Sequence, residues 1–185
     1  WAVRDLTRFY LGEFFDHPVP ADYDGDGSSE AGVFRQSEGL WSVRFLTRAY
    51  FGDDRDVPVP GDYAGDGTGR IALFRPSEGV WNVRGFSRKY FGTMGDIPAG
   101  EDFDGDGRKD YGVFRPEAGL WRVATAAWGA TAFFGEAGDW PQPANYSGDG
   151  TADLAVYRPA DGLWAVRFLT RSSWGGAEEI PVTRR

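Results

Sequence analysis

The sequence predicts an all-β fold built from tandem repeats of about 40 residues, and three observations support this prediction. Tryptophan recurs at near-constant spacing, at Trp1, Trp41, Trp81, Trp121 and Trp164. Aromatic residues make up 16% of the 185 residues, and aromatic side chains favour strands over helices. The 27 glycines and 11 prolines interrupt the chain too often for long helices, so we expect short strands joined by turns.

The recurring tryptophans define the repeat units. The units cover residues 1–40, 41–80, 81–120 and 121–163, and residues 164–185 form a partial fifth unit. A unit of this size cannot bury both faces of a small sheet by itself, so copies must stack on one another. We therefore expect a single repeat domain over residues 1–185.

The first element of each unit is a strand that begins at the tryptophan. Its copies are WAVRDLT, WSVRFLT, WNVRGFS and WAVRFLT, in which Trp and Val share one face and Arg lies on the other. Residues 121–127, WRVATAA, are the poorest copy. A short aromatic strand follows as FYLG, AYFG, KYFG, AFFG and, in the last unit, SSWG. A turn is expected at the glycine that ends each copy.

The second half of each unit contains a proline segment and an apolar strand. The proline segments are DHPVP, DVPVP, DIPAG, DWPQP and EIPVT. Proline cannot donate to a strand ladder, so these segments belong at a sheet edge or in a connecting arm. The apolar strands AGVFRQSEGL, IALFRPSEGV, YGVFRPEAGL and LAVYRPADGL end in a tight turn before the next Trp, as in a β-hairpin. Each repeat thus contains three or four short antiparallel strands.

The apolar strands also predict how the repeats pack. In the second copy, Ile71 and Leu73 lie on one face and Ala72 and Phe74 on the other, so both faces are apolar. A sheet of this kind needs a neighbour on each side. A β-propeller of three- to four-stranded antiparallel blades provides these neighbours and leaves only short edges. An open solenoid of β-units has the same local strands and is the alternative.

The number of predicted strands determines whether this chain can form a complete ring of propeller blades. With the apolar strand counted as the first of each blade, residues 1–20 supply a blade without its first strand, and residues 22–183 supply four whole blades. We expect a five-bladed propeller or a segment of a larger ring. Further repeats, or a strand added by another chain, would complete it.

An acidic, glycine-rich loop lies between the proline segment and the apolar strand of the first four units. The first loop has the pattern D-x-D-x-D-G-x-x-E and the third has D-x-D-x-D-G-x-x-D. The candidate metal ligands are Asp22, Asp24, Asp26 and Glu30 in the first loop, and Asp102, Asp104, Asp106 and Asp110 in the third. Alternate spacing in a tight turn, with glycine to allow positive φ, points several carboxylates at one centre.

Such loops favour a calcium ion. Four carboxylates about 4 Å apart repel by roughly 1–4 kcal/mol per pair, so the arrangement is unfavourable without a cation. Oxygen ligands select Ca²⁺ over zinc or copper. Val33 occupies the twelfth position of the first loop, where an EF-hand has its bidentate Glu, so that role falls to the acid at position nine. An Asx-rich solvated turn is the alternative interpretation.

The other two loops are degenerate copies. The fourth keeps an oxygen at every ligand position with only two charges, which predicts a weaker calcium site formed by Asn145, Ser147, Asp149 and Asp153. In the second loop, Asp62 and Asp66 remain, but Ala64 and Arg70 replace two ligands. Because the Arg70 guanidinium is able to take the place of the metal, we expect no calcium there.

The repeat resembles the bacterial FG-GAP or VCBS-like repeats through the run PVPADYDGDGSSEAGVFRQSEGLW and its three later copies. The resemblance covers nearly the whole chain, and it implies a β-propeller. Such repeats are similar to those of integrin α-chain propellers, in which corresponding loops bind calcium, although the present unit is shorter. The resemblance implies a secreted or cell-surface module for recognition or adhesion, with a glycan or protein ligand. Ala64 and Arg70 depart from the family pattern in the second loop.

Composition and charge argue against several classes of partner. The net charge of −8 does not suit nucleic acid, whose phosphates are bound mostly by clustered Lys and Arg. No segment approaches the ~18 apolar residues of a membrane span, so no membrane insertion is expected. The absence of cysteine excludes disulfides and thiolate metal sites.

The sequence does not predict a catalytic site. A glycosidase needs a pair of unique carboxylates about 5–9 Å apart, whereas nearly every acid here recurs in the repeat. The only histidine, His17, occupies a position that is apolar in the other units, which predicts a packing residue and not a base. A structural element completed by another chain, and a secreted glycoside hydrolase or its accessory domain, are the alternatives to a recognition module.

Recurring aromatic and basic side chains are the remaining candidates for binding. Strict periodicity favours the tryptophans as core between blades over a role in sugar stacking. Trp128 lies in the only insertion, ATAAWGAT, and is the candidate aromatic for an asymmetric ligand contact, with an exposed strand Trp as the alternative. The recurring arginines are expected to tie neighbouring blades together through carboxylates or carbonyls, and they are Arg35, Arg75, Arg115 and Arg158.

Overall fold

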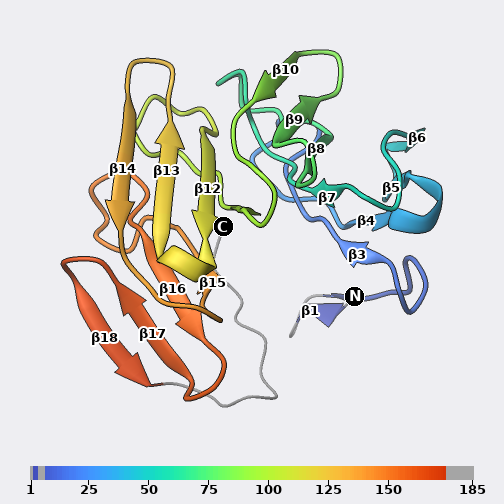
Figure 1. Cartoon of the computed structure of the whole chain (residues 1–185). Coiled ribbons are helices and arrows are strands. Elements are labelled where there is room, and N and C mark those ends of the chain that lie inside the picture. The colour runs from blue at the N-terminus through green and yellow to red at the C-terminus, as the bar shows by residue number, and fades with distance from the viewer. Residues whose placement is uncertain (1, 4–6, 174–185) are drawn as a thin grey trace. The chain divides into compact units, whose positions relative to one another are not determined.

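The computed structural model describes residues 2–3 and 7–173 (Figure 1). Two compact units make up the chain, unit 1 (Trp1–Tyr90) and unit 2 (Phe91–Arg185). Regular structure in the described residues is strand, apart from two short 3-10 helices, η1 (Gln36–Glu38) and η2 (Pro116–Ala118). In that part of the chain, no helix has the length and apolar character needed to cross a membrane.

Each unit contains two four-stranded antiparallel sheets of the type that forms propeller blades. In unit 1, the first blade consists of β3 (His17–Pro18), β4 (Gly32–Arg35), β5 (Leu40–Val43) and β6 (Thr47–Tyr50), and the second of β7 (Val57–Pro58), β8 (Ala72–Arg75), β9 (Val80–Val83) and β10 (Ser87–Tyr90). In unit 2, the third blade consists of β11 (Ile97–Pro98), β12 (Tyr111–Arg115), β13 (Leu120–Ala124) and β14 (Gly129–Phe133), and the fourth of β15 (Trp140–Pro141), β16 (Ala155–Arg158), β17 (Leu163–Val166) and β18 (Thr170–Ser173). The predicted all-β fold of antiparallel propeller blades is thus confirmed.

A two-stranded sheet precedes these blades. Strand β1 (Ala2–Val3) pairs antiparallel with β2 (Thr7–Arg8), and by sequence the two correspond to the third and fourth strands of a blade. The end of the predicted partial unit, residues 174–185, lies outside the described residues. The number of blades in a closed ring therefore stays a prediction.

Each blade is a meander that begins at its proline segment. Strand β3 pairs with β4, with Pro18 opposite Val33, and the same register recurs in the other blades. The proline strands lie at one edge of every sheet, as predicted. The blade nevertheless starts one strand earlier than the sequence analysis assumed. The reason is that the acidic loop reverses the chain and lays the proline segment beside the apolar strand that follows it.

The core of each unit combines side chains from both of its blades. In unit 1, Phe34 and Trp41 of the first blade form a buried cluster with Ile71 and Leu73 of the second. Trp121 takes the position of Trp41 in the cluster of unit 2. The indole N–H of each of these tryptophans donates to a backbone carbonyl in the connection that follows. The predicted role as core between blades is confirmed for Trp41 and Trp121, whereas Trp164 is only partly buried and Trp1 lies outside the described residues.

The glycines two residues before Trp41 and Trp121 are required by a close approach of two backbone segments. Gly39 has a φ of 63°, and a Cβ at this position would collide with the carbonyl oxygen of Gly52. Gly119 has the same relation to Gly135 in unit 2. The N–H of Phe51 donates to the Gly39 carbonyl at 2.8 Å, so the connection to the next blade passes directly over this turn.

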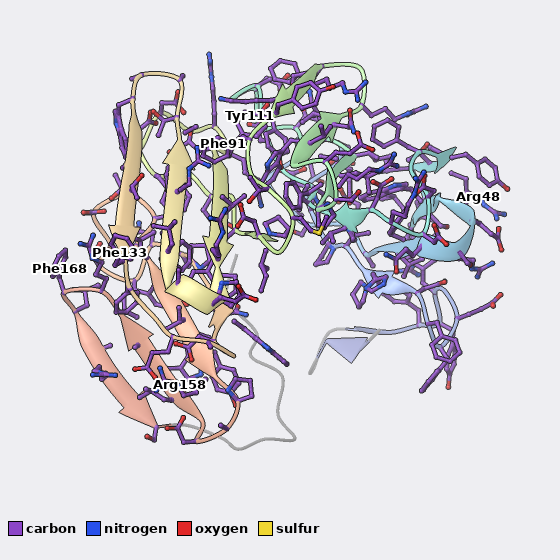
Figure 2. All side chains as sticks on the ribbon, in the orientation of Figure 1. Arg48, Phe91, Tyr111, Phe133, Arg158 and Phe168 are labelled. Carbon is purple, nitrogen blue, oxygen red and sulfur yellow. The ribbon has the colours of Figure 1, made fainter. Side chains whose placement is uncertain are left out.

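The turns between the third and fourth strands of the first, second and fourth blades each hold a residue in the left-handed region. In the second blade this residue is Gly85, with a φ of 71°. Phe45 in the first blade and Phe168 in the fourth both have a φ of 64°, and they are 89% and 90% exposed. Such a conformation is rare and strained for a bulky residue, and the hydrophobic pattern does not predict it. Figure 2 shows Phe168 at the turn between β17 and β18.

Candidate functional site

The acidic loops lie between the first and second strands of each blade. Across the first loop, a short bridge pairs Ala21 with Glu30. Asp22 organises the turn, because its Oδ1 accepts the N–H of Gly25 at 2.7 Å and its Oδ2 accepts that of Gly27 at 2.8 Å. Both glycines have positive φ, 79° and 90°, which explains why the acids alternate with glycine.

Three of the four predicted ligands in the first loop lie together. Asp22, Asp24 and Glu30 each offer a carboxylate oxygen within 4.8 Å of the other two. Glu30 is held by the Tyr23 N–H, which donates to its Oε2 at 2.8 Å. Asp26 lies outside this group, and its Oδ1 accepts the Ser28 N–H at 2.7 Å.

The third loop repeats this arrangement with a more buried acid. Asp102, Asp104 and Asp110 form the group, again within 4.8 Å, whereas Asp106 accepts the N–H of Arg108 at 2.9 Å. Asp110 is only 4% exposed. Burial raises the pKa of its carboxyl to about 7, and repulsion from the other three acids of the loop acts in the same direction. A cation among these carboxylates would offset both effects.

In the second loop, Arg70 provides the positive charge. Its Nη2 lies 2.6 Å from Asp66 Oδ2, and its Nη1 lies 3.1 Å from the other Asp66 oxygen and 3.5 Å from Asp62 Oδ1. The same Nη1 donates to the Thr68 carbonyl at 3.1 Å. The hydrogen bonds with Arg70 lower the pKa of the Asp66 carboxyl to about 2. The guanidinium thus bridges the two remaining acids of this loop.

The fourth loop keeps the same turn with fewer charges. Asn145 Oδ1 accepts the Gly148 N–H at 2.7 Å, in the way that Asp22 accepts that of Gly25. Asp153 accepts the N–H groups of Tyr146 and Ser147 at 2.9 and 2.8 Å. Asp149 accepts the N–H and the hydroxyl of Thr151, both at 2.8 Å. The fourth loop therefore keeps the backbone of the first acidic loop, but it has two carboxylates where the first loop has four.

Consecutive loops within a unit are joined by a hydrogen bond. The N–H of Gly69 in the second loop donates to the Asp22 carbonyl of the first at 2.5 Å. In unit 2, the N–H of Ala152 donates to the Asp102 carbonyl at 2.7 Å. The position of the first ligand in one loop is therefore tied to the backbone of the next loop.

The recurring arginines pair with buried aspartates that the sequence analysis did not single out. The Nε to Oδ1 distances are 3.0 Å for Arg35–Asp16 and 2.7 Å for Arg75–Asp56, Arg115–Asp96 and Arg158–Asp139. Each aspartate precedes the proline strand of the blade that carries its arginine. The predicted carboxylate partners therefore exist, but they tie the incoming connection to its own blade. These aspartates could have been found from the sequence, because an Asp recurs two residues before Pro in each of these repeats.

Two further predicted positions lie at the surface. His17 is exposed, and its Nε2 lies 3.2 Å from Gln36 Oε1, so its predicted packing role is wrong. Trp128 is 45% exposed immediately before β14, in the hairpin with the insertion, where it is open to contact with a ligand.

Comparison with protein-family models, with curated proteins and with solved structures gives no match to this chain. The resemblance to FG-GAP or VCBS-like repeats therefore rests on the sequence motifs.

Proposed function

We propose that this protein is a non-catalytic extracellular module for recognition or adhesion, with blades stabilised by calcium and a glycan or protein as its ligand. The observation that carries the proposal is the convergence of three carboxylates in each of two loops at the same place in their blades. Oxygen-only ligands and a buried Asp110 fit a hard divalent cation. The resemblance to FG-GAP or VCBS-like repeats supports the extracellular setting.

The surface supports a binding role. Large apolar side chains are exposed at the ends of the third and fourth strands, among them Phe45, Trp128 and Phe168. Aromatic side chains are enriched at binding interfaces relative to the rest of a protein surface. Calcium in an acidic loop would hold the start of the second strand of that blade in place, because the loop leads directly into this strand. The second strand pairs with the third, so the end of the third strand would also be held in place.

A glycan array probed with the whole chain in calcium and in EGTA tests this proposal. We expect binding that requires calcium and that falls in Asp102→Asn, with Asp54→Asn as a surface control. An obligate oligomer in size-exclusion chromatography, with no glycan or protein bound in either buffer, would favour an assembly element instead.

A further inference from the structure

A groove of about 360 Å³ runs between the first and second blades of unit 1. Tyr23, from the first acidic loop, forms one wall, and Leu46 and Thr47, from the turn into β6, form another. Arg70 and Arg84 lie on the side of the second blade. Binding sites for small molecules have volumes of roughly 300–1,000 Å³, so this groove suits one small ring and not a large ligand.

The groove contains two positively charged side chains, those of Arg70 and Arg84. The charge of Arg70 is matched by Asp62 and Asp66, which its guanidinium contacts. Arg84 is exposed, and no carboxylate in the part of the chain that the structure describes forms an ion pair with it. This is a notable position for an unpaired cation, because the chain as a whole has a net charge of −8. A guanidinium of this kind presents its N–H donors to a carboxylate in a two-point geometry.

The other walls combine apolar and polar surface. Leu46 is 44% exposed and offers aliphatic surface, whereas Ile71, at the base of the groove, is 7% exposed and belongs to the core of unit 1. Thr47 adds a hydroxyl group at the exposed start of β6. A pyranose ring has matching properties, because one face presents C–H groups and the rim presents hydroxyls.

We propose that this groove binds an acidic sugar residue, a pyranose that carries a carboxylate. Arg84 binds the carboxylate, Leu46 contacts the C–H face, and Thr47 bonds with a ring hydroxyl. This inference rests on the proposed recognition function and specifies its ligand. Because Tyr23 lies between Asp22 and Asp24, the wall that it forms depends on the order of the first acidic loop.

Phe45 provides a second contact for a longer acidic glycan. It directly precedes Leu46, is 89% exposed and keeps a left-handed conformation that glycine adopts in the second blade. The Arg44 guanidinium covers its ring at 4.3 Å from the centroid. A strained and exposed aromatic residue contributes little to the fold, which favours a role in contact with a ligand. We assign it to the next sugar residue of an oligosaccharide.

Calorimetric titration of the whole chain in calcium tests the groove, with glucuronate, glucose, acetate and inorganic phosphate as probes. We expect binding of glucuronate, at least tenfold weaker binding of glucose, and no comparable binding of acetate or phosphate. Arg84→Gln should lower the affinity for glucuronate at least tenfold. Arg48→Gln removes one charge from a different surface of unit 1 and should leave the affinity unchanged.

Phe45→Gly tests the second contact without harm to the fold, because it relieves the strained backbone. It should weaken an acidic disaccharide severalfold and leave glucuronate unaffected. Equal binding of glucuronate and phosphate would show a simple anion site and overturn the sugar assignment. No binding of glucuronate, or equal loss in Arg48→Gln, would also overturn it. If glucuronate does not bind but the array shows calcium-dependent binding of neutral glycans, the acidic-sugar assignment fails and the proposed recognition function stands.

Discussion

Arg75 and Asp56 form a two-point ion pair, in which Nε lies 2.7 Å from Oδ1 and Nη2 lies 2.7 Å from Oδ2. The Asp56 side chain is 2% exposed, and its Oδ2 also accepts the Asp53 N–H at 3.0 Å. One carboxylate therefore holds the turn before the blade and joins it to the second strand of that blade. The same pairing recurs in all four blades described above.

We expect Asp56→Ala to lower the free energy of unfolding of unit 1 by about 2 kcal/mol. The substitution leaves the Asp53 N–H without its acceptor and removes the buried carboxylate from Arg75, which keeps its contact with Asp53 Oδ2 at 2.9 Å. Urea denaturation measures the change. Asp54→Ala, at an exposed neighbouring position, should cause little change, and equal stability of the two variants would contradict a structural role for the pair.

Chelation of calcium should lower the melting temperature by several degrees, because a ligand that binds only the folded state stabilises it by mass action. Differential scanning calorimetry in calcium and in EGTA measures the shift. Asp102→Asn should reduce the shift, whereas Asp106→Asn should do so less, because Asp106 lies outside the group of three acids. Identical melting in both buffers would refute calcium binding.

A calcium site should be created in the second loop by Ala64→Asp combined with Arg70→Glu. The double substitution restores the acids of the first loop and removes the guanidinium that bridges Asp62 and Asp66. Equilibrium dialysis should show one more calcium ion per chain than in the natural sequence. Arg70→Gln alone lacks the added acids and serves as the control, and an unchanged count in the double variant would count against the loop as a metal scaffold.

The Asp66 carboxyl should titrate near pH 2, and Arg70→Gln should return its pKa toward the ordinary value of 3.8. Because folding lowers this pKa, the contribution of the pair to stability is complete above the ordinary pKa and is lost as the pH falls through about 2. Carbon-detected NMR of the carboxyl group follows the titration. Arg55→Gln leaves the loop intact and should not move it.

Gly39→Ala should lower the free energy of unfolding by roughly 2 kcal/mol or more, because its Cβ would meet the Gly52 carbonyl oxygen in a left-handed backbone. Gly85→Ala separates the collision with a neighbouring carbonyl from the conformational cost of a side chain in a left-handed backbone. Gly85 also has a positive φ, but a Cβ there would have no neighbour within 4 Å, so only the conformational cost of about 1 kcal/mol is expected. Equal losses in the two variants would exclude the close approach.

The strands were predictable because the alternation of side chains between two faces and the regular spacing of Trp are signals local to each segment. Packing between strands then stabilises the same conformation. Which strand begins a blade was not predictable in the same way, since it depends on a pairing across the acidic loop, such as Pro18 with Val33. The spacing predicted that the acids of the first loop converge, but it did not show that Asp26, which accepts the Ser28 N–H, lies outside the group of three. The strain at Phe45 was invisible because the hydrophobic pattern describes side chains and not φ.

The hydrogen bond from Gly69 to Asp22 couples two loops that differ in charge, because Arg70 lies among the acids of the second loop and only carboxylates converge in the first. Arg70 is covalently part of the chain, so no chelator can remove its charge from the first pair of loops. The pair in unit 2, linked from Ala152 to Asp102, has only acids and neutral oxygens at the corresponding positions. Under the proposed function, a fall in ambient calcium would therefore destabilise both acidic loops of unit 2. In unit 1 it would destabilise only the first acidic loop, because Arg70 keeps the second in place.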